Sequence, residues 1–145
     1  MKRACRRYRW QCHAYCLMST HYHLLITTRE ANISRGMQWL NGLYAAAFNE
    51  KYATHGHVFG ARFAAKHVVS DAHLLGVVAY IAKNPVGACL CRRPEDWRFS
   101  SYPALIGQQR SGFLELKTIL RMFAFDPEEA RRRVEEFVCP DEMTA

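Results

Sequence analysis

The chain has 145 residues, half of them hydrophobic, which suits one domain whose core needs no disulfide bonds. Its formal net charge is +7, but residues 1–93 carry thirteen Lys/Arg and three acids, whereas residues 94–145 carry seven and ten. The first part is therefore suited to a polyanion, nucleic acid above all, and the last part is not. No stretch has the roughly 18 apolar residues of a membrane span, and no segment resembles a signal peptide, so we expect a cytoplasmic protein with reduced cysteines and no membrane partner.

Two strand patterns follow a short basic and aromatic start. Residues Trp10–Met18 and Tyr22–Thr28 are rich in aromatic and apolar side chains, and a polar pair separates them. They predict an antiparallel hairpin. Apolar residues then recur at helical spacing from Asn32 to about Tyr52, which predicts a long helix.

A strand and a second helix are predicted in the middle of the chain. Residues 58–59 and 63–69 have the composition of a bent strand or hairpin. Ser70-Asp71 is a typical helix cap, and Pro85 is expected to stop that helix at Asn84.

Two acidic, amphipathic helices close the pattern. They span about Phe113–Phe123 and Pro127–Val138, and Asp126 before Pro127 is a good cap for the second. The order of strand, strand, helix, strand, helix and helical appendix predicts an α+β fold with an antiparallel sheet.

His21 and His23 are two residues apart in the second predicted strand. Side chains at this spacing share one face, so two neutral imidazoles can ligate one divalent ion. The pair also fits the solvent face of a half-buried strand with no ligand.

Tyr80 and Asn84 are four apart in the second predicted helix and are therefore neighbours on its surface. A tyrosine hydroxyl can act as a covalent nucleophile, and an amide oxygen can be a metal ligand. Ordinary packing at a helix boundary explains the tyrosine equally well.

Longer motifs, in the same order and at about the same spacing, resemble those of REP-associated tyrosine transposases, which are single-tyrosine HUH transposases. The matching motifs are CLMSTHYHLLI at 16–26, SRGMQWLN at 34–41, FN at 48–49, HGHVF at 55–59, YIAKNPV at 80–86 and PEDWRFSSY at 94–102. The resemblance implies a ferredoxin-like HUH domain, with helices on one face of its sheet, over residues 1–107. Residues 108–145 form the helical appendix.

The resemblance also implies roles for the candidate residues. His21, His23 and Asn84 hold a divalent metal, Mg²⁺ or Mn²⁺, and Tyr80 is the nucleophile. The implied activity is DNA transposition: cleavage and joining of single-stranded DNA, near a hairpin, through a 5′-phosphotyrosine intermediate. A divalent ion offsets charge at the scissile phosphate, and imidazole ligands favour the softer Mn²⁺.

Basic residues are assigned to the DNA. The start of the chain mixes cations with aromatic residues, as phosphate and stacking contacts require. The DNA-binding candidates are Arg7, Arg9, Arg62, Lys66 and Lys83.

The chain departs from the family at its start, where members usually have a first strand and helix ahead of the hairpin. We expect an N-terminally truncated chain, in preference to a second copy that completes a homodimer or a changed strand order. Gly87 also replaces a common arginine. An inactive remnant that only binds DNA is therefore the alternative function. A zinc module built from Cys12, Cys16 and the two histidines is a third hypothesis.

Overall fold

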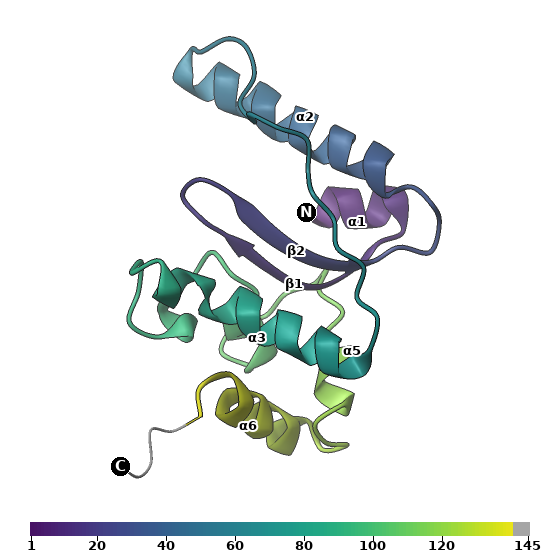
Figure 1. Cartoon of the computed structure of the whole chain (residues 1–145), viewed down its shortest axis with the longest axis vertical. Helices are drawn as coiled ribbons and strands as arrows, with labels where there is room; N and C mark the ends of the chain where they lie inside the picture. The colour runs from purple at the N-terminus through teal and green to yellow at the C-terminus, as the bar shows by residue number, and fades with distance from the viewer. Residues whose placement is uncertain (141–145) are drawn as a thin grey trace. The chain divides into compact units, whose positions relative to one another are not determined.

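The computed structural model describes residues 1–140. The chain divides into two compact units. The first comprises Met1–Trp10 with Thr28–His67, and the second comprises Gln11–Thr27 with Val68–Ala145 (Figure 1). The final residues, 141–145, which belong to the predicted appendix, lie outside the described part. Within residues 1–140, no helix combines the length and the apolar character needed to cross a membrane.

The second unit is built on an antiparallel hairpin of β1 (Gln11–Leu17) and β2 (Tyr22–Thr27), which confirms both predicted strands within a residue or so. The register shifts between Cys12 and Ala14, where His13 forms a bulge. The outer edge of β1 is bonded to later parts of the chain. Leu17 N donates to Phe99 O at 2.9 Å, Ser101 N to Tyr15 O at 2.9 Å, and Glu115 N to Cys12 O at 2.8 Å.

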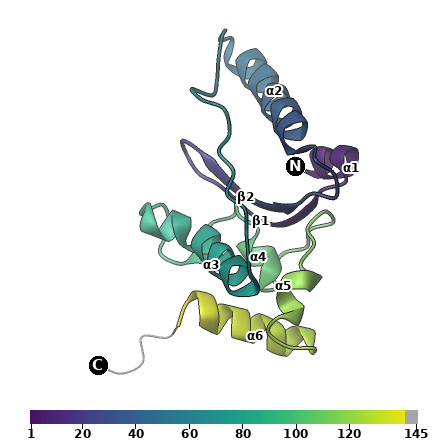
Figure 2. The ribbon, with the colours of Figure 1, turned by 45° about the vertical axis from the view of Figure 1, so that its right-hand side comes forward.

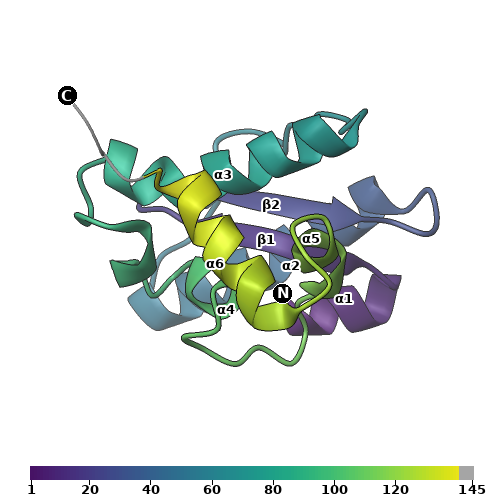
Figure 3. The same ribbon diagram turned by 90° about the horizontal axis from the view of Figure 1, so that it is seen from below.

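Helix α3 (Asp71–Gly87) covers one face of this hairpin (Figures 1 and 3). Ser70 caps it as predicted, because its Oγ accepts from His73 N at 3.2 Å. The predicted stop at Asn84 is wrong, since Pro85 lies inside the helix. A proline so close to the helix end removes one backbone hydrogen bond, and its complete burial offsets that loss.

The core of the second unit lies between β1, β2, α3 and the C-terminal segments. Its buried members include Ala14, Cys16, Leu25, Val78, Ile81, Ala82, Ile119, Val134 and Val138. The 3₁₀ turn η1 (Pro94–Asp96) packs against α3, and the short α4 (Tyr102–Leu105) packs against η1. The predicted Phe113–Phe123 helix is reduced to α5 (Lys117–Arg121), because the residues before it pair with β1.

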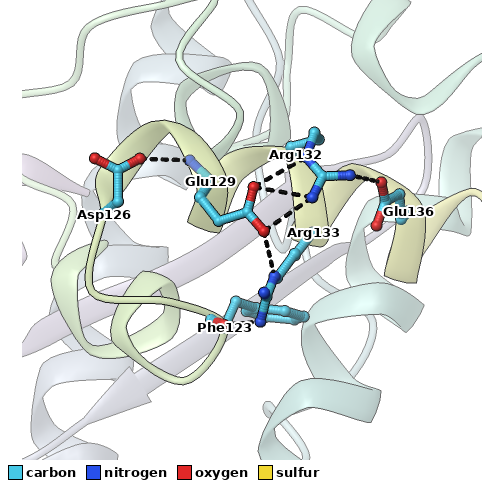
Figure 4. A network of polar contacts seen from close by, with 6 residues as sticks. All are labelled: Phe123, Asp126, Glu129, Arg132, Arg133 and Glu136. Carbon is cyan, nitrogen blue, oxygen red and sulfur yellow. Dashed lines mark hydrogen bonds and ion pairs between the residues drawn. The ribbon is translucent and has the colours of Figure 1, made fainter.

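Helix α6 (Pro127–Val138) packs on α3 and α5 (Figure 2), and its predicted bounds are confirmed. Asp126 caps it by accepting from Glu129 N at 2.8 Å. On its exposed side Glu129 accepts from Arg132 and Arg133, and Arg132 also pairs with Glu136 (Figure 4).

The first unit consists of α1 (Lys2–Tyr8), α2 (Ile33–Tyr52) and an irregular segment. Helix α2 was predicted, whereas α1 was not. The two helices meet at Trp10, whose buried indole lies against Gly36 and donates from Nε1 to Asn32 Oδ1 at 2.8 Å. Asn32 Nδ2 donates in turn to Tyr8 O at 3.1 Å. One buried amide thus joins the end of α1 to the start of α2.

The predicted strand over residues 58–69 is wrong, because no residue of this range is in a strand. A strand needs a partner to satisfy its backbone groups, and most of this range is exposed. The sheet of the described residues therefore has two strands. The α+β class is confirmed, with fewer strands than the four of a ferredoxin-like unit.

Candidate active site

The hairpin turn brings His21 and His23 into contact. Met18 N donates to His21 O at 2.8 Å and closes the turn just before β2. The two Nε2 atoms are 3.1 Å apart, and the rings meet edge to face with centroids 4.9 Å apart. The predicted sharing of one face is thereby confirmed.

The surroundings of His23 favour the neutral form of its imidazole. Burial, with the charge of His21 as a smaller cause, lowers the pKa of His23, and a hydrogen bond with Asn84 opposes the shift. The neutral ring is the form that binds a metal. Thr20 Oγ1 lies 3.1 Å from His21 Nδ1. A proton on Nδ1 bonded to this hydroxyl leaves Nε2 free as a ligand.

Helix α3 adds Tyr80 and Asn84 from the same chain. The Tyr80 ring stands edge to face with His23 at a centroid distance of 5.4 Å, and the residue is 58% exposed. Asn84 Nδ2 donates to Tyr80 O at 2.8 Å. The Asn84 side chain also influences the pKa of His23, so this amide lies beside the imidazole pair. Four predicted site residues are thus neighbours.

The nitrogen pair has the spacing of a chelating pair. Bonds of about 2.1 Å meeting at about 90–110° separate two ligand atoms by roughly 3.0–3.4 Å, and the two Nε2 atoms are 3.1 Å apart. Residues 1–140 contain no cluster of three or more His, Cys, Asp or Glu side chains suited to a metal ion. A metal here would therefore take two imidazoles, with oxygen from the Asn84 amide, water or phosphate completing its shell.

The family model described as "Transposase IS200 like" matches residues 1–84, more than half of the chain. The chain belongs to the IS200-like transposase family. No curated protein and no solved structure matches it. Family membership implies a DNA-binding, DNA-processing enzyme of transposition, and it confirms the resemblance seen in the sequence motifs.

The predicted DNA contacts of this transposase are spread over both units. Arg7 and Arg9 are exposed on and just after α1, and Arg62 and Lys66 are exposed in the irregular segment of the first unit. Lys83 is exposed on α3, one residue from Asn84. The structure thus puts one predicted cation, Lys83, on the helix that carries Tyr80.

The structure adds Arg3 and Trp39 to the predicted DNA contact Arg7. The guanidinium carbons of Arg3 and Arg7 lie 5.7 and 5.3 Å from the centre of the Trp39 ring. Arg3 and Arg7 are one helical turn apart on α1, and this i,i+4 spacing was the available signal. Such stacked arginines keep N–H groups available to phosphate.

The cysteines proposed for zinc are instead part of the packing. Cys12 and Cys16 are fully buried on β1, and Cys16 Sγ lies 3.5 Å from Met18 Sδ. Burial raises the pKa of Cys16 to about 11. Within residues 1–140 neither cysteine belongs to a group of three or more His, Cys, Asp or Glu side chains that could hold a metal ion, so the structure disfavours the zinc hypothesis.

Proposed function

We propose that this chain cuts and rejoins single-stranded DNA near a hairpin through a 5′-phosphotyrosine on Tyr80. One observation carries the proposal. An exposed tyrosine stands 5.4 Å, ring centre to ring centre, from a histidine whose Nε2 is 3.1 Å from that of a second histidine, all in one chain. The catalytic residues then fall within the proposed catalytic domain of residues 1–107, and a single copy holds a complete set.

The chemistry follows from the side chains. The Tyr80 oxygen attacks the scissile phosphorus and forms the P–O bond, the phenolic proton leaves to solvent, and the 3′ oxygen departs as a hydroxyl. The bond energy is kept in the tyrosyl ester, so a second 3′-OH can displace Tyr80 and rejoin the strand. His21, His23 and Asn84 would hold a divalent ion, Mn²⁺ or Mg²⁺, which offsets charge on the phosphate when bound.

Asn84 has a second task in this proposal. Its Nδ2 donates to Tyr80 O at 2.8 Å, and its amide lies beside His23, whose pKa it influences. The same side chain therefore spans the helix that carries the nucleophile and the strand that carries the ligands. The contact of the Tyr80 ring with His23, at a centroid distance of 5.4 Å, keeps the nucleophile close to a phosphate held at the imidazoles.

DNA binding is proposed for the basic residues of the chain. Arg7, Arg9, Arg62 and Lys66 supply charge from the first unit, with Arg3 and Trp39 joining Arg7, and Lys83 supplies it beside Tyr80. Their exposure and the +10 charge of residues 1–93 suit a phosphate backbone. A cytoplasmic location remains part of the proposal.

Covalent capture of DNA tests the activity. Hairpin oligonucleotides with randomised single-stranded flanks, labelled at the 3′ end, are incubated with the protein and Mn²⁺ and resolved on a denaturing gel. The 5′-phosphotyrosine predicts a labelled adduct from 3′-labelled DNA and none from 5′-labelled DNA. Tyr80→Phe should abolish the adduct.

Tyr52→Phe is the matched control, because Tyr52 is 55% exposed, nearly as much as Tyr80, but lies at the end of α2. This variant should retain the adduct. An adduct that still forms with Tyr80→Phe would contradict the assignment of Tyr80 as the nucleophile. DNA binding by the wild type with no adduct in any condition would favour the binding-only remnant, which the two-stranded sheet supports.

A further inference from the structure

The turn formed by residues 97–100 is fixed to the end of β1 that leads to the histidines. Trp97 Nε1 donates to Leu17 O at 2.9 Å, and Leu17 N donates to Phe99 O at 2.9 Å. The turn closes on itself through Ser100 N and Trp97 O at 3.2 Å. Both bonds to Leu17 anchor the turn to β1 within the second unit.

The pairing of β1 gives the distance from this turn to the candidate active site. Cys16 is paired with His23 on one side and bridged to Ser100 on the other. With neighbouring strands about 4.8 Å apart, Ser100 lies roughly 10 Å from His23. Stacked nucleotides rise about 3.4 Å each, so this span is on the order of three nucleotides.

The tip of the turn carries an exposed aromatic ring with a cation over it. Phe99 is 44% exposed, and the guanidinium carbon of Arg98 lies 4.7 Å from its ring centre. The Trp97 ring meets the Phe99 ring in a T-shaped contact, with centroids 5.4 Å apart. Among residues 1–140, no carboxylate forms an ion pair with Arg98. Proteins bind single-stranded nucleic acid with cations that contact the phosphates and with aromatic rings on which bases stack. This turn offers one group of each kind.

We propose that Arg98 and Phe99 form a nucleotide-binding site for the single strand on one side of the scissile phosphate. Phe99 stacks on a base through the face that Arg98 does not cover, and Arg98 contacts a phosphate of the same strand. The site rests on the proposed function, which it extends by a fixed contact a few nucleotides from Tyr80. Stacking on the ring makes no hydrogen bond to the edge of a base, and every base has a face that can stack. The site therefore accepts any base.

Abasic scanning tests the stacking contact. A fluorescent DNA hairpin with a single-stranded thymidine flank is prepared with one abasic site at each flank position in turn, and its binding is measured by anisotropy. Wild-type affinity should fall about 5- to 100-fold at one position, a few nucleotides from the cleaved bond. Phe99→Ala should lower affinity for the intact flank by a similar factor and show no further loss at that position.

Three variants separate stacking from folding and from general exposure. Phe99→Leu keeps an apolar side chain on Trp97 but removes the aromatic ring, so it should behave as Phe99→Ala does. Phe99→Tyr should bind as the wild type does. Phe125→Ala is the matched control, because Phe125 is 99% exposed between α5 and α6, and it should leave both affinity and the abasic profile unchanged.

Arg98 has its own readout. Each contact to a single-strand phosphate contributes about 0.7 to the slope of log affinity against log salt concentration, so Arg98→Gln should reduce the magnitude of that slope by about 0.7. If the wild type forms the Tyr80 adduct but Phe99→Ala retains the full abasic penalty, the stacking site is overturned while the proposed function stands. If the wild type neither binds the hairpin nor forms an adduct, both the stacking site and the proposed function are wrong.

Discussion

Replacing Gly36 by alanine probes the packing that holds the first unit together. A Cβ at this position would lie 2.0 Å from Cζ2 and 2.5 Å from Cη2 of Trp10. The indole cannot retreat easily, because it is 4% exposed and its Nε1 is bonded to Asn32 Oδ1 at 2.8 Å. The added methyl group must therefore displace the Trp10 ring or separate it from α2.

Opposing effects decide the sign of the change in the free energy of unfolding. Overpacking costs about 1–3 kcal/mol, and loss of the buried bond from Trp10 to Asn32 costs about 1 kcal/mol more. Alanine in place of glycine inside a helix stabilises the helix by up to about 1 kcal/mol. The clash outweighs the gain in helix propensity, so we expect Gly36→Ala to destabilise the protein by about 1–3 kcal/mol.

Gly42 in the same helix supplies the control, since a Cβ there meets nothing within 4 Å. Gly42→Ala should stabilise the protein by up to about 1 kcal/mol through helix propensity alone. Urea unfolding followed by circular dichroism measures both variants. The same stabilisation in both would refute the close packing of Trp10 on Gly36.

Two further predictions concern charge and metal. Hydrogen bonds from Arg132 and Arg133 lower the pKa of Glu129, so its ionised form favours the folded state above the ordinary glutamate pKa, and this contribution is lost as the pH falls through the lowered value. Glu129→Gln should therefore melt below the wild type at neutral pH, and the difference should vanish in acid; a difference in melting temperature that persists unchanged in acid would contradict the pairing. His23→Ala should weaken Mn²⁺ binding, measured by electron paramagnetic resonance, by about tenfold or more. His73→Ala, at the far end of α3, should leave that affinity unchanged, and an equal effect of both variants would argue against the proposed ligands.

Local patterns account for the elements that were predicted well. Aromatic and apolar composition predicted β1 and β2, and helical spacing with a cap predicted α2 and α6. The one-face arguments for His21 with His23, and for Tyr80 with Asn84, hold because both depend on backbone geometry within a few residues.

The errors arose where distant residues decide the outcome. Pro85 continues α3 because the core of the second unit buries it. Residues 63–69 look like a strand but have no strand to pair with among the described residues. Helix α1 is short and strongly basic, and its local propensity is weak. It is held by Asn32, which lies twenty-four residues from Tyr8.

The chemistry of the candidate site can be seen in the sequence without a structure: a histidine pair, a tyrosine and an amide stand at spacings that local backbone geometry turns into neighbours. The contact between the histidine pair on the hairpin and the Tyr80–Asn84 pair on α3, by contrast, depends on tertiary packing. Helix α3 lies on the hairpin and thereby sets the 5.4 Å between the Tyr80 and His23 rings. The pairing of β1 on both edges likewise brings Ser100 within two strand spacings of His23, although seventy-seven residues separate them. Such contacts depend on which surfaces bury each other, and no spacing along the chain encodes that directly.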